Sequence, residues 1–214
     1  MLNKKKTTRY FWSREYTARD KESSETSIYR RGIKKMKDMI IKRLERMHRK
    51  GITEFINYLE HSTFFQDAAS TKYHGAYLGG LADHSINLYE FFRKMLHYFK
   101  LTEEVDDDSA LIISIAHDLC KVGLYLGGAK PFRKNNNMSK EHAVASLNIV
   151  EKYIKLTDLE RQCILYHMGM YATKEFSSSY IGQYQMKELS DAFNEKIVKL
   201  FYFCDDMVSQ FVDE

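Results

Sequence analysis

Residues 110–121, which read ALIISIAHDLCK, end an apolar run with an imidazole, a carboxylate and an ammonium group. These groups belong to His117, Asp118 and Lys121. Burying a charge without a partner is costly, so buried ionisable groups in proteins are normally paired or bind a metal. The segment therefore indicates a polar site that is held in place by an apolar helix.

Four of the eight histidines lie in apolar helical segments rather than among charged neighbours. They are His84, His117, His142 and His167. One such histidine is more often a hydrogen-bonded core residue than a ligand. Four of them on four helices, with Asp118 beside one, match the way in which helical bundles build internal metal sites from facing helices.

Two adjacent carboxylates, Asp205 and Asp206, lie in another apolar run, FYFCDDMV. Buried carboxylates without a nearby cation repel each other or take up protons, so this pair also points to a metal. Imidazole and carboxylate ligands suit manganese, iron, cobalt, nickel or zinc better than calcium, and they do not choose among these ions. Helical periodicity leaves open which aspartate faces the site, because both faces are apolar here.

The remaining sequence predicts an all-α protein, because apolar residues recur at helical spacing almost throughout. It contains one proline and no alternating strands of useful length. Thr157 and Glu160 form a capping-box pattern at the start of one helix. Residues 127–140 and 172–187 are expected to be connections. Helices are expected at about 27–50, 81–99, 110–121, 140–155, 158–171 and 189–211, and residues 52–65 are expected to form a short helix that runs into a loop.

The net charge of +4 over 214 residues is unevenly distributed. Residues 1–50 hold 17 Lys and Arg against 6 Asp and Glu, a charge of +11, and the remainder holds 16 against 23, a charge of −7. We divide the chain into a flexible basic arm at 1–26, a basic amphipathic helix at 27–50 and a helical domain at 51–214. The basic part is either a solvated surface or a patch that contacts nucleic acid.

Three cysteines, Cys120, Cys163 and Cys204, are far apart, odd in number and set among apolar residues. This usage predicts reduced, buried thiols in a cytoplasmic protein. No apolar stretch approaches the roughly 20 residues that span a bilayer. The first residues, MLNKKKTTRYFW, lack the apolar segment of a signal peptide. We therefore expect no membrane span.

The order of the candidate ligands resembles that of the HD-domain metal-dependent phosphohydrolases, over about residues 50–210. Three stretches resemble a subgroup of small stand-alone HD hydrolases, and they read STKYHGAYLGGLADHS, AHDLCKVG and LYHMGMY. The first two are also similar to the HD portion of a bacterial 3′→5′ exoribonuclease. The resemblance implies an HD helical bundle, which here carries an extra basic N-terminal helix.

The resemblance also implies two divalent metal ions with Asp118 as the bridging ligand. The first ion would be held by His84, His117, Asp118 and a late aspartate, for which we prefer Asp206 and keep Asp205 as the alternative. His142 and His167 would complete the second site.

Further residues are implied to contact the substrate. Lys121 lies four residues after His117 on the same predicted helix face, and it would point at the substrate phosphate. His74 and Tyr73 would lie at the pocket mouth, and the basic loop residues Arg133 and Lys134 would attract the substrate. Asp118 and Lys121 are thus the expected catalytic residues.

The implied reaction is hydrolysis of a phosphoester of a nucleotide or nucleic acid, above all a phosphodiester, by a metal-activated water. A nucleotidase or dNTP triphosphohydrolase is the alternative within this class. An alternative of another class is a nucleic-acid or nucleotide binding protein with a regulatory metal site. In each case residues 1–50 could add a nucleic-acid contact.

Overall fold

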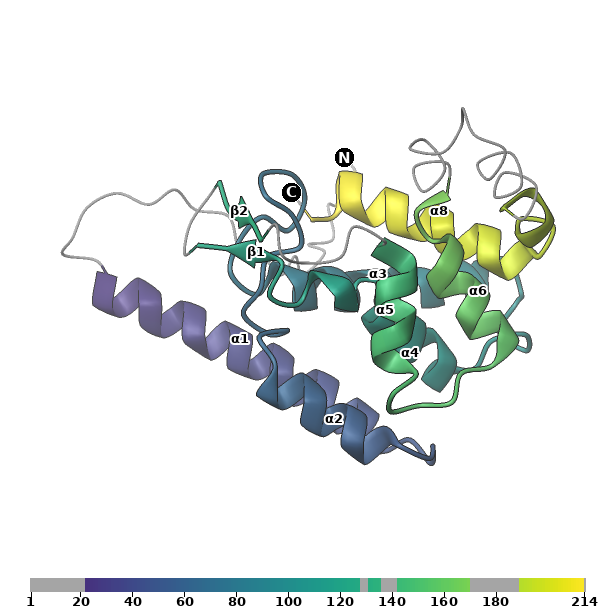
Figure 1. Cartoon of the computed structure of the whole chain (residues 1–214), viewed down its shortest axis with the longest axis horizontal. Coiled ribbons are helices and arrows are strands. Elements are labelled where there is room, and N and C mark those ends of the chain that lie inside the picture. Colours follow the sequence, from purple (N-terminus) through teal and green to yellow (C-terminus); the bar gives the residue numbers. More distant parts are fainter. Residues whose placement is uncertain (1–21, 128–130, 136–141, 170–188, 214) are drawn as a thin grey trace, which may run out of the picture.

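The structure, a computed structural model, describes residues 22–127, 131–135, 142–169 and 189–213. It is a bundle of helices (Figure 1), so the all-α prediction is confirmed. The longer helices are α1 (Glu22–Leu44), α2 (Ile52–His61), α3 (Gly80–Tyr98), α4 (Asp107–Ala116), α5 (His142–Val150), α6 (Asp158–Tyr166) and α8 (Lys196–Phe211). Helices α1 and α2 lie side by side along one edge of the bundle (Figure 1).

Helix α3 is at the centre of the packing, because it contacts α1, α4 and α8. Its buried aromatic residues include Phe92, whose ring meets that of Phe201 on α8 edge to face, with 5.2 Å between centroids. Ile40 and Leu44 of α1 are buried in the same hydrophobic core. The basic helix thus packs onto the body of the protein through its apolar face.

The helix starts follow local capping. Asp106 precedes α4, and its side chain accepts a hydrogen bond from the Ser109 backbone N–H at 2.7 Å. Thr157 and Glu160 form both bonds of the capping box at the start of α6, which confirms that prediction. These bonds satisfy backbone donors that have no partner inside the helix.

Several predicted helix boundaries are wrong. In the three cases that follow, the helix is shorter than the apolar pattern. Helix α1 ends at Leu44 rather than near residue 50, and Met47 is buried from the turn that follows. The predicted helix 110–121 leaves its α-helical path after Ala116. The predicted helix 189–211 is interrupted, so that α8 begins at Lys196 with Glu195 as its N-cap. Apolar residues in these turns reach the core as helical ones would, so periodicity alone does not reveal the ends.

Part of the loop that was predicted at 127–140 forms one strand of a short strand pair. Strand β1 (Tyr125–Leu126) pairs in an antiparallel arrangement with β2 (Arg133–Lys134). The Phe132 backbone N–H donates to the Thr71 carbonyl at 3.0 Å, and the Phe132 side chain is buried. The strand pair is therefore fixed to the segment that precedes α3.

That segment folds closely over the first turn of α3. A Cβ atom at Gly80 would lie 1.9 Å from the Gly75 carbonyl oxygen, and Gly75 has a φ of 54°. Both positions therefore require glycine. The close approach places residues 73 and 74 next to the part of α3 that carries His84.

Two simpler observations concern the cysteines and the helix lengths. The three cysteines are free and buried, as predicted. Among the helices of the described ranges, none combines the length and the apolar character that a membrane crossing requires.

Candidate metal centre

Four side chains from three parts of the chain meet inside the bundle. His84 extends from α3, His117 is the C-cap of α4, Asp118 follows it, and Asp205 extends from α8. The His84 and His117 Nε2 atoms are 3.2 Å apart. Asp205 Oδ1 lies 3.1 Å from His84 Nε2 and 3.7 Å from His117 Nε2. Two imidazoles and a carboxylate thus converge on one point, where a cation would be held.

The two carboxylate oxygens of Asp118 face different pairs of histidines. Oδ2 lies 3.2 Å from His117 Nε2 and 3.9 Å from His84 Nε2. Oδ1 lies 2.8 Å from His142 Nε2 and 3.7 Å from His167 Nε2. Asp118 therefore stands between two groups of donors.

The backbone fixes the rings of two of these histidines. His117 Nδ1–H donates to the Ser114 carbonyl at 2.8 Å, and His167 Nδ1–H donates to the Ile164 carbonyl at 2.7 Å. Each acceptor lies three residues earlier at the end of a helix, where carbonyls lack helical partners. With Nδ1 occupied in this way, Nε2 is the nitrogen of each ring that faces Asp118.

The other two histidines are oriented by side chains. His84 Nδ1 lies 2.6 Å from Asp213 Oδ2, and His142 Nδ1 lies 3.3 Å from Cys120 Sγ. A second partner on the far ring nitrogen is the usual arrangement for a histidine that binds a metal. All four rings thus present Nε2 to the same centre.

The donor set fits a metal, and one atom makes the case directly. His167 Nε2 is a buried nitrogen with no hydrogen-bond partner among the described residues. Leaving a buried polar atom without a partner is costly, and a bound cation would satisfy it. The donors His84, His117 and Asp118 all lie within 4.8 Å of one another, as do Asp118, Cys120 and His142.

The pKa values show how strongly the site attracts positive charge. Burial would lower the pKa of His84, but its hydrogen bonds to Asp205 and Asp213 raise it to about 10. Burial would also lower the pKa of His142, and the bond to Asp118 raises it to about 9. In contrast, burial and the nearby charge of His117 lower the pKa of His167 to about 4. The carboxylates around His84 and His142 therefore favour positive charge at this centre, as a metal site requires.

Lys121 supplies a further cation. The chain after His117 forms a short 3₁₀ helix, η1 (Leu119–Lys121), and so the prediction that Lys121 shares an α-helical face with His117 is wrong. The tighter turn is closed by the Lys121 backbone N–H, which donates to the Asp118 carbonyl at 2.9 Å. It brings Lys121 Nζ to 2.6 Å from Asp118 Oδ2.

This pairing holds Asp118 in its charged form. Burial alone would raise the pKa of Asp118, but the charges of Lys121 and His117 keep it well below the usual value. The same contact raises the pKa of Lys121 above its usual value, against the effect of burial. Both groups are therefore ionised at neutral pH.

The choice between the two late aspartates is corrected by the structure. Asp206 does not face the cluster, because its carboxylate accepts an exposed hydrogen bond from the Gln210 side chain at 3.2 Å. Asp205, which was the alternative, faces His84 and His117, and its pKa is held below the usual value by His117 and His84 although burial opposes this. Adjacent residues on a helix point about 100° apart, so only one can face the site.

Of the expected substrate residues in the segment before α3, His74 contacts the cluster and Tyr73 is exposed. The His74 ring lies against that of His84, with 5.2 Å between centroids, and burial lowers the pKa of His74 to about 4. The Tyr73 side chain is 69% exposed. Ser70 fixes both residues, because its Oγ accepts from the Tyr73 N–H and donates to the His74 carbonyl.

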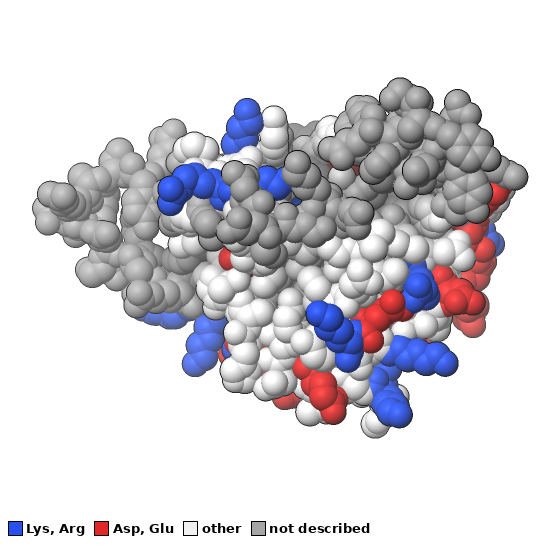
Figure 2. Space-filling model, in the orientation of Figure 1, with Lys and Arg blue, Asp and Glu red and all other residues white. Residues whose placement is uncertain are grey.

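The basic side chains near this segment come from β2 and from residue 72. Arg133 and Lys134 are exposed on β2, and Lys72 Nζ lies 5.2 Å from the centre of the Tyr73 ring. Figure 2 shows blue side chains around the strand pair. The remaining basic residues of the loop 127–140, Lys130 and Lys140, lie outside the described residues.

The basic N-terminal region is only partly described, since residues 1–21 lie outside the described ranges. Several of its described cations pair with acidic groups of the body. Lys37 lies 3.1 Å from Glu60, and Arg43 lies 3.2 Å from Glu90. Arg49 binds Glu160 through both guanidinium nitrogens. Part of the positive charge of residues 1–50 therefore holds the helix against the protein.

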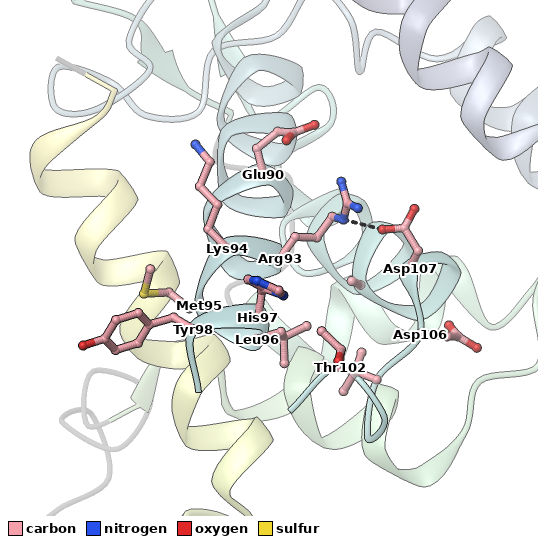
Figure 3. Close-up of a pocket in the computed structure, with 12 residues that line it drawn as sticks. Glu90, Arg93, Lys94, Met95, Leu96, His97, Tyr98, Thr102, Asp106 and Asp107 are labelled. Carbon is pink, nitrogen blue, oxygen red and sulfur yellow. Dashed lines mark ion pairs between the residues drawn. The ribbon is translucent and has the colours of Figure 1, made fainter. Parts of the chain in front are cut away.

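A hollow of about 750 Å³ lies apart from this cluster, at the C-terminal end of α3 and the start of α4 (Figure 3). Its lining includes Arg93, Lys94 and Asp107, and Arg93 pairs with Asp107. None of the clustered histidines or aspartates lines it. We assign no function to this hollow.

Three residues that contact the site were not expected from the sequence. Asp213 and Asn87 lie behind His84, and Cys120 lies behind His142. Asp213 is 129 positions from His84, so no local spacing could connect the two. Asn87 is three residues after His84 on α3 and shares its face, which is a signal only once His84 is known as a ligand.

Comparison with models of protein families matches residues 81–201 to the HD domain. The match covers more than half of the 214 residues, and it includes the four histidines, Asp118 and Lys121. Asp205 follows four residues after its end. Neither a curated protein nor a solved structure matched the chain.

Proposed function

Because the chain belongs to the HD-domain family of metal-dependent phosphohydrolases, we propose that it hydrolyses a phosphodiester of a nucleotide or nucleic acid. The observation that supports the diester is the position of Asp118 between two groups of donors. One group consists of His84, His117 and Asp205, and the other of His142 and His167. Two groups joined by one carboxylate suit two divalent ions.

Divalent ions in such a site lower the pKa of bound water and offset charge on a phosphoryl group. The protein residues hold that chemistry in place. The backbone carbonyls of Ser114 and Ile164 orient His117 and His167, and the apolar helix α4 places Asp118 in a buried position. A rigid donor set costs little reorganisation when the substrate reacts.

Lys121 is proposed to bind the substrate phosphate. Its ammonium lies beside Asp118 and is almost fully buried, so a phosphate oxygen would replace part of its lost hydration. In a site of low dielectric, such a charge stabilises the added negative charge of a phosphoryl transition state. Lys121 would thus bind the substrate phosphate and also stabilise the transition state.

A nucleotide is favoured by the residues at the edge of the site. Tyr73 presents an exposed ring, and the ring of the next residue, His74, packs against that of the proposed ligand His84. An exposed aromatic ring can stack on a base, and the exposed Arg133 and Lys134 can meet flanking phosphates. We propose that the base stacks on Tyr73 while its phosphate lies next to Lys121.

The proposal is tested with protein loaded with Mn²⁺ or Co²⁺ and a panel of linear RNA, single-stranded DNA, cyclic dinucleotides and dNTPs. Shortened oligomers or opened cyclic dinucleotides support the diesterase. Release of triphosphate or inorganic phosphate from mononucleotides would instead identify a nucleotidase or dNTP triphosphohydrolase. Salt-dependent nucleic-acid binding without turnover would identify a binding protein.

The control for this panel is His117→Ala, which removes a proposed ligand from the centre of the site. It should abolish hydrolysis of bis(p-nitrophenyl) phosphate, whereas equal rates for the variant and the wild type across several metals would contradict the proposal. A cytoplasmic location and a nucleic-acid contact through residues 1–50 stay predictions. Strong loss of RNA binding without loss of model-substrate hydrolysis after removal of residues 1–21 would support that contact.

A further inference from the structure

Helix α8 and the residues after it hold His84 on both ring nitrogens. Asp205, within the helix, lies 3.1 Å from Nε2, and Asp213, just past its end, lies 2.6 Å from Nδ1. The sequence between them turns so that Val212 and Asp213 both donate their backbone N–H to the Val208 carbonyl. The turn brings a second carboxylate back toward α3.

The Asp213 carboxylate is buried, and both of its oxygens accept hydrogen bonds. Oδ2 accepts from His84 Nδ1, and Oδ1 accepts from the Asn87 side-chain amide at 2.9 Å. Because Asn87 lies one helical turn after His84, both partners come from the same face of α3. A carboxylate fixed at both oxygens also fixes the plane and rotation of the imidazole ring.

We propose that Asp213 is a positioning residue that holds His84 as a metal ligand, an inference that rests on the metal site of the proposed function. Asp213 accepts a hydrogen bond from Nδ1–H of His84, and Nε2 of the same ring then faces Asp118 and Asp205. A carboxylate behind a ligating histidine also raises the basicity of the ring and strengthens its bond to the metal. Asp213 itself does not touch the substrate.

Asp213 also joins the metal site to the segment that precedes α3. Its backbone carbonyl accepts a hydrogen bond from the Gly75 N–H at 3.3 Å, and Gly75 directly follows Tyr73 and His74 in the chain. The His74 ring rests on that of His84. The Asp213 side chain therefore orients His84, and its backbone carbonyl holds the segment before α3. A substitution of the side chain removes the bond to His84 and leaves the backbone bond to Gly75 available.

The test measures metal affinity rather than activity. Zn²⁺ is titrated against a competing chelator into metal-free wild type, Asp213→Asn and Asp213→Ala. We expect the affinity of the tightest ion to fall about 10- to 100-fold in both variants. Asp191→Asn, which neutralises an exposed carboxylate on the same C-terminal part of the chain, is the matched control and should bind as the wild type does.

A second readout distinguishes positioning from a general loss of structure. In zinc-loaded wild type labelled with ¹⁵N-histidine, the His84 Nδ1–H should give a downfield proton resonance that exchanges slowly, because it is buried and bound to a carboxylate. Asp213→Ala should lose this resonance and keep those of His117 and His167, which are bound to carbonyls. Loss of all three would indicate a structural role and overturn the proposal.

A swapped pair, Asp213→Asn with Asn87→Asp, provides the rescue. The asparagine at 213 can accept from His84 Nδ1–H and donate to the carboxylate at 87, so affinity should recover at least in part relative to Asp213→Ala. Wild-type affinity in Asp213→Ala, or no recovery in the swap, would contradict the inference. Absence of Zn²⁺ binding in the wild type would instead contradict the proposed function.

Discussion

Lys121 Nζ lies 2.6 Å from Asp118 Oδ2, and both side chains are buried. The same oxygen is 3.2 Å from His117 Nε2, so an ammonium and an imidazole share it. A lysine in this position offsets the charge of Asp118 in the metal-free protein. It would also lie next to any phosphate bound at the site.

Replacement of Lys121 by methionine is expected to lower kcat/KM by about 10²- to 10³-fold, because a charge aimed at the phosphoryl oxygens is lost. Methionine retains much of the aliphatic stem, and the metal ligands are unchanged. Hydrolysis of bis(p-nitrophenyl) phosphate and metal analysis of the same sample provide the measurement. A variant that keeps its metal and its full rate would exclude the phosphate role.

The stability of this variant gives an independent control. Breaking a buried ion pair by removal of one partner costs about 3–5 kcal/mol, and here the neighbouring histidines limit the effect. Urea unfolding should therefore show a larger loss in the metal-free protein than in the metal-loaded one, since bound cations replace the missing charge. Equal losses in both forms would show that Lys121 acts through packing alone.

Asp205 and Asp206 allow a matched comparison of neighbouring carboxylates. Asp205→Asn is expected to reduce metal affinity by about 10-fold or more, because its carboxylate faces His84 and His117. Asp206→Asn removes a carboxylate that contacts Gln210 at the surface, and it should bind metal as the wild type does. Isothermal titration with Mn²⁺ checks both variants. The reverse ranking would restore Asp206 as the ligand.

His167→Ala tests the second group of donors around Asp118. We expect the variant to lose one of two equivalents of metal and most of its diesterase activity, because Asp118 Oδ1 would keep only His142. Removal of the unpartnered, buried Nε2 should cost the metal-free fold little by itself. Metal analysis after gel filtration gives the stoichiometry, with the exposed His97→Ala as the control. A single equivalent in the wild type would favour a nucleotidase.

Glu160 makes a pH-dependent contribution to stability away from the metal centre. Burial would raise its pKa, but bonds from the Arg49 side chain and the Thr157 backbone N–H lower it below the usual value of 4.5. A carboxyl group whose pKa is depressed by folding stabilises the protein above its unfolded pKa, and this contribution is lost as the pH falls through the folded pKa.

Glu160→Gln should therefore be less stable than the wild type by about 3 kcal/mol at pH 7, because it leaves Arg49 without its charged partner. The difference between the two proteins should shrink as the pH falls below the unfolded pKa of Glu160. Urea unfolding from pH 7 to pH 3 measures it, with the metal removed throughout. A constant difference over this range would show that the charge of Glu160 contributes nothing.

The class of fold and most of the site could be predicted from local patterns. Helical periodicity and the capping box at Thr157 are determined within a few residues, so the all-α class and the start of α6 were predicted from the sequence. The positions of the four histidines and of Asp118 were also predicted, because ionisable groups in apolar segments require partners. The ends of α1 and α4 and the start of α8 could not be predicted, because apolar residues in a turn can pack as helical ones do.

The sequence by itself determined which residue types occupy the centre: four imidazoles, two aspartates and a lysine in apolar segments. Only the tertiary structure decided which atoms meet. It selected Asp205 over Asp206 through the rotation of α8, and it moved Lys121 onto Asp118 through the 3₁₀ turn. It also placed Asp213 behind His84 across 129 positions. These contacts depend on how separate helices pack, and no spacing along the chain records that.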